Sequence, residues 1–162
     1  MMKKSTLYAA YGSNLNLAQM EARCPGARVL GAGRISGYRL AFKRVGVCAI
    51  EPCQGEYVPV GIWEIGERNE AALDSYEGVP AHYGKETVEV EMAEGKVRGM
   101  VYVMNRRAVP ALPGQGYFMG ILKGYHSFGL EEQKLWEAWY RAGGDRSVAC
   151  GTHRQHPQYI RE

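Results

Sequence analysis

The fold is decided by the stretch Thr6-Leu7-Tyr8-Ala9-Ala10-Tyr11-Gly12-Ser13-Asn14-Leu15, near the start of the chain. Its first half, Thr6–Ala10, is apolar and predicts a short buried strand. Its second half turns through Gly12 into a helix pattern that runs from Leu15 to Arg23 and stops at Pro25-Gly26. Such a junction leaves backbone N–H groups unpaired at the start of the helix, where the helix dipole also favours negative charge. The turn therefore suits an anion such as a carboxylate.

The same turn has a plainer interpretation, in which Ser13 or Asn14 caps the helix and binds no ligand. Asn16 is a further candidate for the cap, and Leu17 and Met20 are expected on one face of the helix. The sequence leaves both interpretations open. A nucleotide-binding P-loop is not expected, because no Lys-Ser/Thr pair ends the turn.

A second candidate is Glu77, at the end of a helix expected over Asn69–Glu77. Asn69 is a plausible cap, and Gly78 marks the stop. Leu73 and Glu77 are four residues apart and share a face, so a core-facing Leu73 would direct Glu77 inward. Burial and the negative end of the helix dipole would both raise the pKa of its carboxyl, as general acid–base chemistry requires. The alternative is a glutamate at a fraying helix end that points into water.

The remaining apolar runs predict strands first and helices last. Strands are expected over Arg28–Ile35, Tyr38–Lys43, Val45–Glu51, Val58–Ile65, Lys85–Met92 and Val97–Met104, and helices over Pro113–Lys123 and Leu130–Arg141. The first two strands are expected to pair around Ser36-Gly37, and the last two to form a hairpin at Glu94-Gly95. This order indicates an α+β fold with a strongly curved sheet or a small barrel.

The composition is that of an ordinary globular chain, with 46% hydrophobic and 23% charged residues. Its 162 residues are expected to form one domain, residues 1–162, with a polar tail over 143–162. The net charge of +3 comes without a basic stripe, so nucleic acid is not an expected partner. The chain shows no secretory signal and no apolar run near the roughly 20 residues of a membrane helix, which predicts a cytoplasmic protein with free thiols.

Other side chains could bind a ligand or a metal. Tyr11, Tyr83 and Tyr117 each lie beside a turn or a helix start and could donate a hydrogen bond to a ligand, although a core ring with its hydroxyl at the surface is the default interpretation for each. A metal site is conceivable at three further residues, Cys150, His153 and His156, but no fourth ligand accompanies them. We therefore expect no metal.

Several of these segments together resemble the gamma-glutamylcyclotransferase-like family, which includes the AIG2-like proteins. Ala10-Tyr11-Gly12-Ser13-Asn14-Leu15 is similar to the substrate loop of that family, and Leu73-Asp74-Ser75-Tyr76-Glu77-Gly78-Val79 is similar to the segment that contains its catalytic glutamate. The strand Val60–Ile65 and the stretch from Pro113 through Tyr117 also have similar counterparts. The resemblance covers the chain from about Thr6 to Trp139.

The resemblance implies a small mixed β-barrel with flanking helices around a single cavity. It also implies a reaction in which the α-amine of a gamma-glutamyl amide attacks its own γ-carbonyl, releasing 5-oxoproline and an amine or amino acid without a cofactor. Glu77 would be the catalytic acid and base. The residues that the resemblance assigns to substrate binding are Tyr8, Ala9, Ala10, Tyr11, Gly12, Ser13, Asn14, Leu15, Tyr83 and Tyr117.

The resemblance does not fix the leaving amine, nor whether the protein is a monomer or a homodimer. Its implied partner is a small gamma-glutamyl substrate rather than a nucleic acid or a membrane. A competing hypothesis keeps the same cavity but makes it a non-catalytic module that binds a small metabolite or a partner protein.

Overall fold

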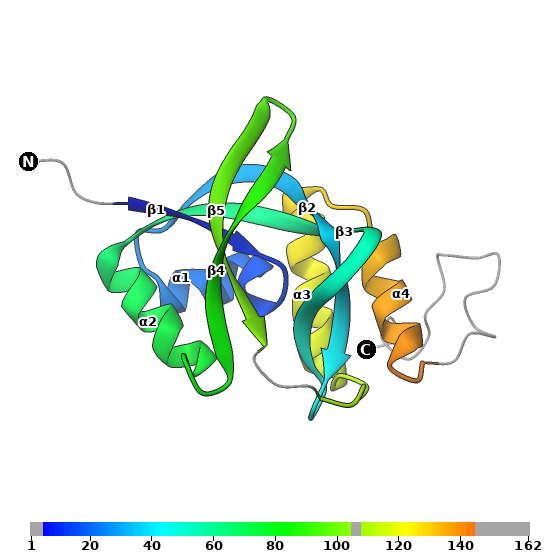
Figure 1. The fold of residues 1–162 in the computed structure, drawn as a ribbon. Coiled ribbons are helices and arrows are strands. Elements are labelled where there is room, and N and C mark those ends of the chain that lie inside the picture. The colour runs from blue at the N-terminus through cyan, green and yellow to red at the C-terminus, as the bar shows by residue number, and fades with distance from the viewer. Residues whose placement is uncertain (1–4, 105–107, 145–162) are drawn as a thin grey trace, which may run out of the picture.

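The computed structural model describes residues 5–104 and 108–144. These residues form a five-stranded barrel with helices packed around it (Figure 1). The elements in chain order are β1 (Ser5–Ala10), the 3-10 turn η1 (Ser13–Leu15), α1 (Leu17–Arg23), β2 (Arg28–Lys43), β3 (Val47–Gly66), α2 (Glu67–Glu77), β4 (Tyr83–Met92), β5 (Gly95–Met104), α3 (Gln115–Phe128) and α4 (Gln133–Arg141). The small mixed barrel with flanking helices is thus confirmed.

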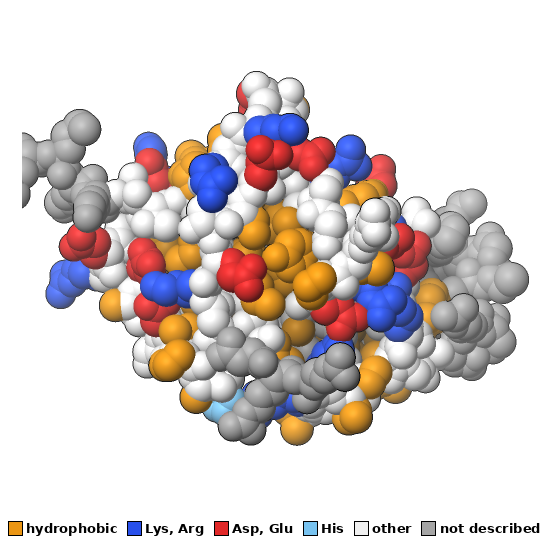
Figure 2. Space-filling view, in the orientation of Figure 1, with side chains coloured by type: hydrophobic (Ala, Val, Ile, Leu, Met, Phe, Trp, Pro, Cys, Tyr) orange, Lys and Arg blue, Asp and Glu red, His pale blue; other side chains and the backbone are white. Residues whose placement is uncertain are grey.

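The barrel closes in the order β1-β3-β2-β4-β5, and all neighbours are antiparallel except β1 and β5. Two of the strand pairings that close the barrel are short. β1 and β5 pair only through Tyr8 and Met100, and β2 and β4 pair only at Gly33 and Arg34. Beyond the β2–β4 junction the strands diverge, and hydrophobic side chains ringed by charged ones fill the space between them (Figure 2).

Gly33 lets β2 and β4 approach closely enough to pair. A Cβ at this position would lie 2.8 Å from the carbonyl oxygen of Glu91 and 2.9 Å from a methyl carbon of Val90. Both distances are shorter than real Cβ contacts, so any side chain at position 33 would push β4 away from β2. The junction therefore requires glycine for close backbone approach.

The predicted breaks within two long strands were wrong. Arg28–Ile35 and Tyr38–Lys43 are halves of one 16-residue strand, β2, and the other two predicted runs, Val45–Glu51 and Val58–Ile65, belong to one 20-residue strand, β3. The register between the strands shifts around Gly37, which has φ +86, so this glycine marks a bulge and not a hairpin turn. The hairpin at Glu94-Gly95 is confirmed as the β4–β5 connection.

The first helix differs from its prediction at its start. It begins at Leu17 instead of Leu15, after the 3-10 turn η1, and Asn16 caps it by accepting a hydrogen bond from the Gln19 N–H at 3.1 Å. Met20 is fully buried as expected, whereas Leu17 is 43% exposed and does not face the core.

The other helices are shifted by a few residues. α2 begins at Glu67, and Gly66 takes the cap position expected for Asn69. α3 extends beyond Lys123 to Phe128, and α4 begins only at Gln133. No helix in the described ranges combines the length and the apolar character needed to cross a membrane.

Candidate active site

A cavity of about 260 Å³ lies where the end of β1, the turn η1, the start of β3 and the end of α2 meet. Most of its walls are phenol rings and hydroxyl groups, and among the described residues Glu77 is the only carboxylate in them. The lining residues are Tyr8, Tyr11, Gly12, Ser13, Asn14, Val47, Cys48, Tyr76, Glu77, Tyr83, Tyr102 and Tyr117. The volume is below the roughly 300–1,000 Å³ typical of sites for drug-sized ligands, so it suits a group about the size of an amino acid.

Glu77 is the last residue of α2 and is turned into the cavity. Leu73, one turn earlier on the same face, is fully buried, which confirms the inward direction of this face. Gly78 ends the helix in the left-handed conformation (φ 66), where glycine is favoured. Burial raises the pKa of the Glu77 carboxyl to about 7, and the positive charge of Arg23 opposes that rise. The group can therefore exchange a proton near neutral pH.

The turn after β1 is held by hydrogen bonds of Asn14 and by Trp63 on β3. The Nδ2 atom of Asn14 donates to the Tyr8 hydroxyl at 3.0 Å, and the indole N–H of Trp63 donates to the Asn14 carbonyl at 3.0 Å. Leu15 is fully buried, close to where a Cβ on Gly61 or on Gly124 would lie. The first N–H groups of a helical turn have no acceptor within that turn, which leaves those of η1 available to bind a ligand.

The backbone of Cys48, near the start of β3, orients two of the tyrosines. Its N–H donates to the Tyr117 hydroxyl at 2.9 Å, and its carbonyl accepts from the Tyr83 hydroxyl at 2.8 Å. Tyr117 therefore keeps its own O–H free to donate, whereas Tyr83 keeps a lone pair free to accept. By the same logic Tyr8, which accepts from Asn14, can donate into the cavity.

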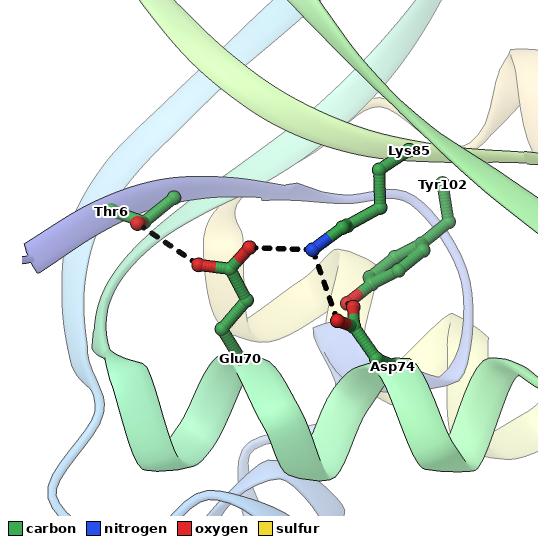
Figure 3. A network of polar contacts seen from close by, with 5 residues as sticks. All are labelled: Thr6, Glu70, Asp74, Lys85 and Tyr102. Carbon is green, nitrogen blue, oxygen red and sulfur yellow. Dashed lines mark hydrogen bonds and ion pairs between the residues drawn. The ribbon is translucent and has the colours of Figure 1, made fainter. Parts of the chain in front are cut away.

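A polar network ties α2 to the barrel one turn before Glu77 (Figure 3). The Nζ of Lys85 on β4 lies 2.7 Å from Glu70 and 3.0 Å from Asp74, both on α2. The Tyr102 hydroxyl on β5 donates to Asp74 at 2.7 Å, and Thr6 on β1 donates to Glu70 at 3.2 Å. Side chains from three strands, β1, β4 and β5, thus bind the helix that carries Glu77.

Comparison with known proteins identifies the family. The family model for gamma-glutamyl cyclotransferase, AIG2-like, matches residues 8–119. The chain belongs to this family. The AIG2-like match includes the turn after β1, the whole of α2 and the start of α3, and so all of the residues that line the cavity.

Individual relatives agree with the AIG2-like assignment. The chain is 31% identical over 123 residues to a gamma-glutamylcyclotransferase from Bos taurus, an alignment that covers 68% of this chain. It spans only 65% of the length of that curated relative. A solved gamma-glutamyl cyclotransferase superposes with a TM-score of 0.76 at 26% identity, covering 83% of this chain and 86% of that one. An uncharacterized protein from Homo sapiens gives a TM-score of 0.75 at 27% identity, covering 84% and 87%.

The structure brings most of the predicted site residues together. Seven of the ten predicted substrate-binding residues line the cavity: Tyr8, Tyr11, Gly12, Ser13, Asn14, Tyr83 and Tyr117. The other three, Ala9, Ala10 and Leu15, are fully buried in the core and support the turn from behind. A direct substrate contact for these three stays a prediction.

Sequence reasoning missed other residues at the site. Cys48, Tyr76 and Tyr102 line the cavity, and Arg23 lies beside the turn. Cys48 acts through its backbone, which no residue-type pattern could indicate. Tyr102 ends a run of four buried residues on β5, so burial does not distinguish it from its neighbours in the core.

The predicted metal candidates Cys150, His153 and His156 lie outside the described residues. Within the described ranges, no group of three or more His, Cys, Asp or Glu side chains is arranged to hold a metal ion.

Proposed function

We propose that this protein is a gamma-glutamyl cyclotransferase, which binds a gamma-glutamyl amide and releases 5-oxoproline and an amine. One observation carries the proposal: Glu77, whose pKa burial raises to about 7, faces a small hydroxyl-lined cavity beside the turn η1. Membership of the AIG2-like family supports the same reaction.

The cavity offers complementary partners for the α-amino acid end of such a substrate. The N–H groups around Gly12 and Ser13 would hold the α-carboxylate, as predicted from the sequence. Glu77 would face the α-amine, and the free lone pair of the Tyr83 hydroxyl provides a second acceptor for it. The free O–H of Tyr117 would then orient the glutamyl chain or the leaving group.

The chemistry is a transfer within one molecule. The substrate α-ammonium gives up a proton, and its nitrogen attacks the γ-carbonyl carbon to form the new C–N bond of a five-membered lactam. The bond from that carbon to the leaving nitrogen then breaks. The lactam nitrogen keeps one of the three ammonium hydrogens and the departing amine takes up two, so the reaction has no net proton change. Glu77 would accept protons from the first nitrogen and return them to the second.

The proposed mechanism assigns the protein no nucleophile, because both reacting groups belong to the substrate. Holding the chain in a folded geometry provides the large effective concentration typical of ring-forming reactions. The tyrosine-lined walls would hold that geometry.

The products provide the test. The protein is incubated with a panel of gamma-glutamyl amides in ¹⁸O-labelled water, and the products are measured by mass spectrometry. Cyclisation yields unlabelled 5-oxoproline, whereas attack by water would yield glutamate carrying one label. Labelled glutamate as the primary product would contradict the mechanism. No turnover across a broad panel would favour a non-catalytic binding module.

A further inference from the structure

Arg23, the last residue of α1, connects the turn after β1 to the end of α2. Its guanidinium donates to the Oδ1 atom of Asn14, to the Ser13 hydroxyl at 3.4 Å and to the Gln19 side chain at 2.9 Å. The guanidinium carbon also lies 3.8 Å from the centre of the Tyr76 ring, over its face. One half-buried cation therefore contacts both parts of the protein that the proposed reaction uses.

The contacts to Asn14 also fix which way that amide points. Its Oδ1 accepts from the cation, so its Nδ2 must face the Tyr8 hydroxyl, to which it donates at 3.0 Å. Removing the guanidinium would free this amide to rotate and would loosen the turn.

Arg23 is the charged side chain that acts on the Glu77 carboxyl in the described part of the chain. Further titratable groups around the cavity, in the described part of the chain, interact with the Glu77 carboxylate. They are Tyr8 on β1, Tyr11 in the turn, Cys48 on β3, Tyr83 on β4 and Tyr102 on β5. Burial raises the pKa of each of them, so all five stay neutral at physiological pH.

We propose that Arg23 is the positioning residue of the site: it holds the substrate turn through Ser13 and Asn14, supports α2 through Tyr76, and places a positive charge beside the end of the helix that carries Glu77. This inference rests on the proposed cyclotransferase function for its kinetic consequences, but not for its structural ones. The two contributions are separable, because charge and planar hydrogen-bonding geometry can be removed independently.

Two variants separate them. Arg23→Gln removes the charge, and Arg23→Lys keeps the charge but loses the planar fork and the stacking on Tyr76. Arg28→Gln is a matched control, since Arg28 pairs with Glu64 on the exposed surface of the barrel. For each protein, the Glu77 carboxyl is titrated by NMR with ¹³C-labelled glutamate, and kcat and KM for a gamma-glutamyl amide are measured from pH 5.5 to 9.

In Arg23→Gln we expect the pKa of Glu77 to rise by about 0.5–1 unit, because a neighbouring cation no longer favours the carboxylate. The corresponding loss in kcat/KM is about 3–10-fold at pH 6 and shrinks toward pH 9. In Arg23→Lys the Glu77 pKa stays close to that of the wild type while KM increases several-fold. Arg28→Gln changes neither quantity.

An unchanged Glu77 titration in Arg23→Gln would overturn the electrostatic role. An equal loss of activity at every pH in both variants would indicate a purely structural residue and would also overturn it. An unchanged KM in Arg23→Lys would overturn the hold on the substrate turn. If the wild type turned over no gamma-glutamyl amide, the proposed function would fail, yet the NMR titration would still decide the inference.

Discussion

At the scale of single residues, the site depends on one carboxyl group in an unfavourable place for a charge. Glu77 ends α2, where backbone carbonyls disfavour a negative charge, and burial disfavours it further. Arg23 opposes both effects only in part. The group is left able to take either protonation state near pH 7.

Replacement of Glu77 by glutamine should abolish most activity while keeping the fold. The amide preserves the shape but cannot carry a proton, so kcat should fall by about 100-fold or more. Steady-state kinetics on the purified variants would check this, with Glu67→Gln at the exposed start of the same helix as the control. A Glu77→Gln protein with wild-type kcat would exclude the assigned role.

A side chain at Gly12 should interfere with substrate binding. A Cβ there would lie 3.2 Å from the Cβ of Cys48 and 4.0 Å from the Tyr117 hydroxyl, inside the cavity wall. Gly12→Val should therefore raise KM sharply, whereas Ser13→Ala, which removes only a hydroxyl, should have a milder effect. Circular dichroism would confirm that the valine variant is folded. A folded Gly12→Val enzyme with unchanged KM would contradict the role of this turn in holding the substrate carboxylate.

Local sequence identified the parts of the site that depend on local geometry. The strand-to-turn junction at Gly12 and the shared face of Leu73 and Glu77 follow from helical and strand periodicity. Arg23 and Tyr102 could not be found this way. Each is defined by a partner far along the chain or on another element, and periodicity shows only that a residue faces inward or outward.

At the scale of elements, α2 is positioned by the network of Lys85, Glu70 and Asp74. Lys85→Met should leave two neighbouring carboxylates without their shared cation, and should lower the free energy of unfolding by about 1 kcal/mol. Because α2 carries Glu77, kcat should also fall. Urea denaturation and kinetics would test this, against Lys96→Met, which removes an exposed pair with Glu89. Equal effects from the two lysine variants would argue against any special role for the network.

Even a methyl group at position 33 should destabilise the pairing of β2 with β4. Gly33→Ala places a methyl group 2.8 Å from the Glu91 carbonyl oxygen, and should cost about 1–3 kcal/mol of stability. Gly116→Ala, in the first turn of α3 with open space around it, should be neutral or stabilising by up to about 1 kcal/mol. Thermal denaturation of both proteins would check the contrast. Equal melting temperatures would show that β4 can shift without cost.

The two long strands, β2 and β3, are the elements that the sequence pattern predicted wrongly. Gly37, Pro52 and Gly55 resemble turn residues, and on local grounds each should interrupt a strand. In the structure Gly37 and Gly55 have positive φ within continuous strands, and Pro52 on β3 pairs with Tyr38 on β2. Pairing over the whole length of β2 and β3 overrides these local preferences, and only the tertiary structure reveals it.

At the scale of the whole molecule, the ionisation of Glu77 should make stability depend on pH. Its folded pKa of about 7 is above the ordinary value of 4.5, so the folded protein binds this proton more tightly than the unfolded chain. The contribution of Glu77 to stability is therefore full below about pH 4.5 and is lost as the pH rises to about 7.

Glu77→Gln removes the free-energy cost of holding a charged carboxylate at this buried position. The variant should be more stable than the wild type by about 1–3 kcal/mol at pH 8, a gain of a few degrees in melting temperature. At pH 5, below the folded pKa and close to the ordinary value of 4.5, most of this difference should be gone. Differential scanning calorimetry at both pH values would measure the difference. A variant no more stable at pH 8 than at pH 5, relative to wild type, would show that Glu77 is not held in an unfavourable charged state.

The attachment of two tyrosines to the backbone of Cys48 has a consequence for how the protein can change over generations. Peptide groups are the same whatever side chain they carry, so Tyr83 and Tyr117 keep their orientation when residue 48 mutates. The Cys48 thiol donates to the carbonyl of Tyr11 at 3.9 Å, and the residue lines the cavity. Selection for a larger or smaller substrate can thus act at position 48 without disturbing the hydroxyl groups around it.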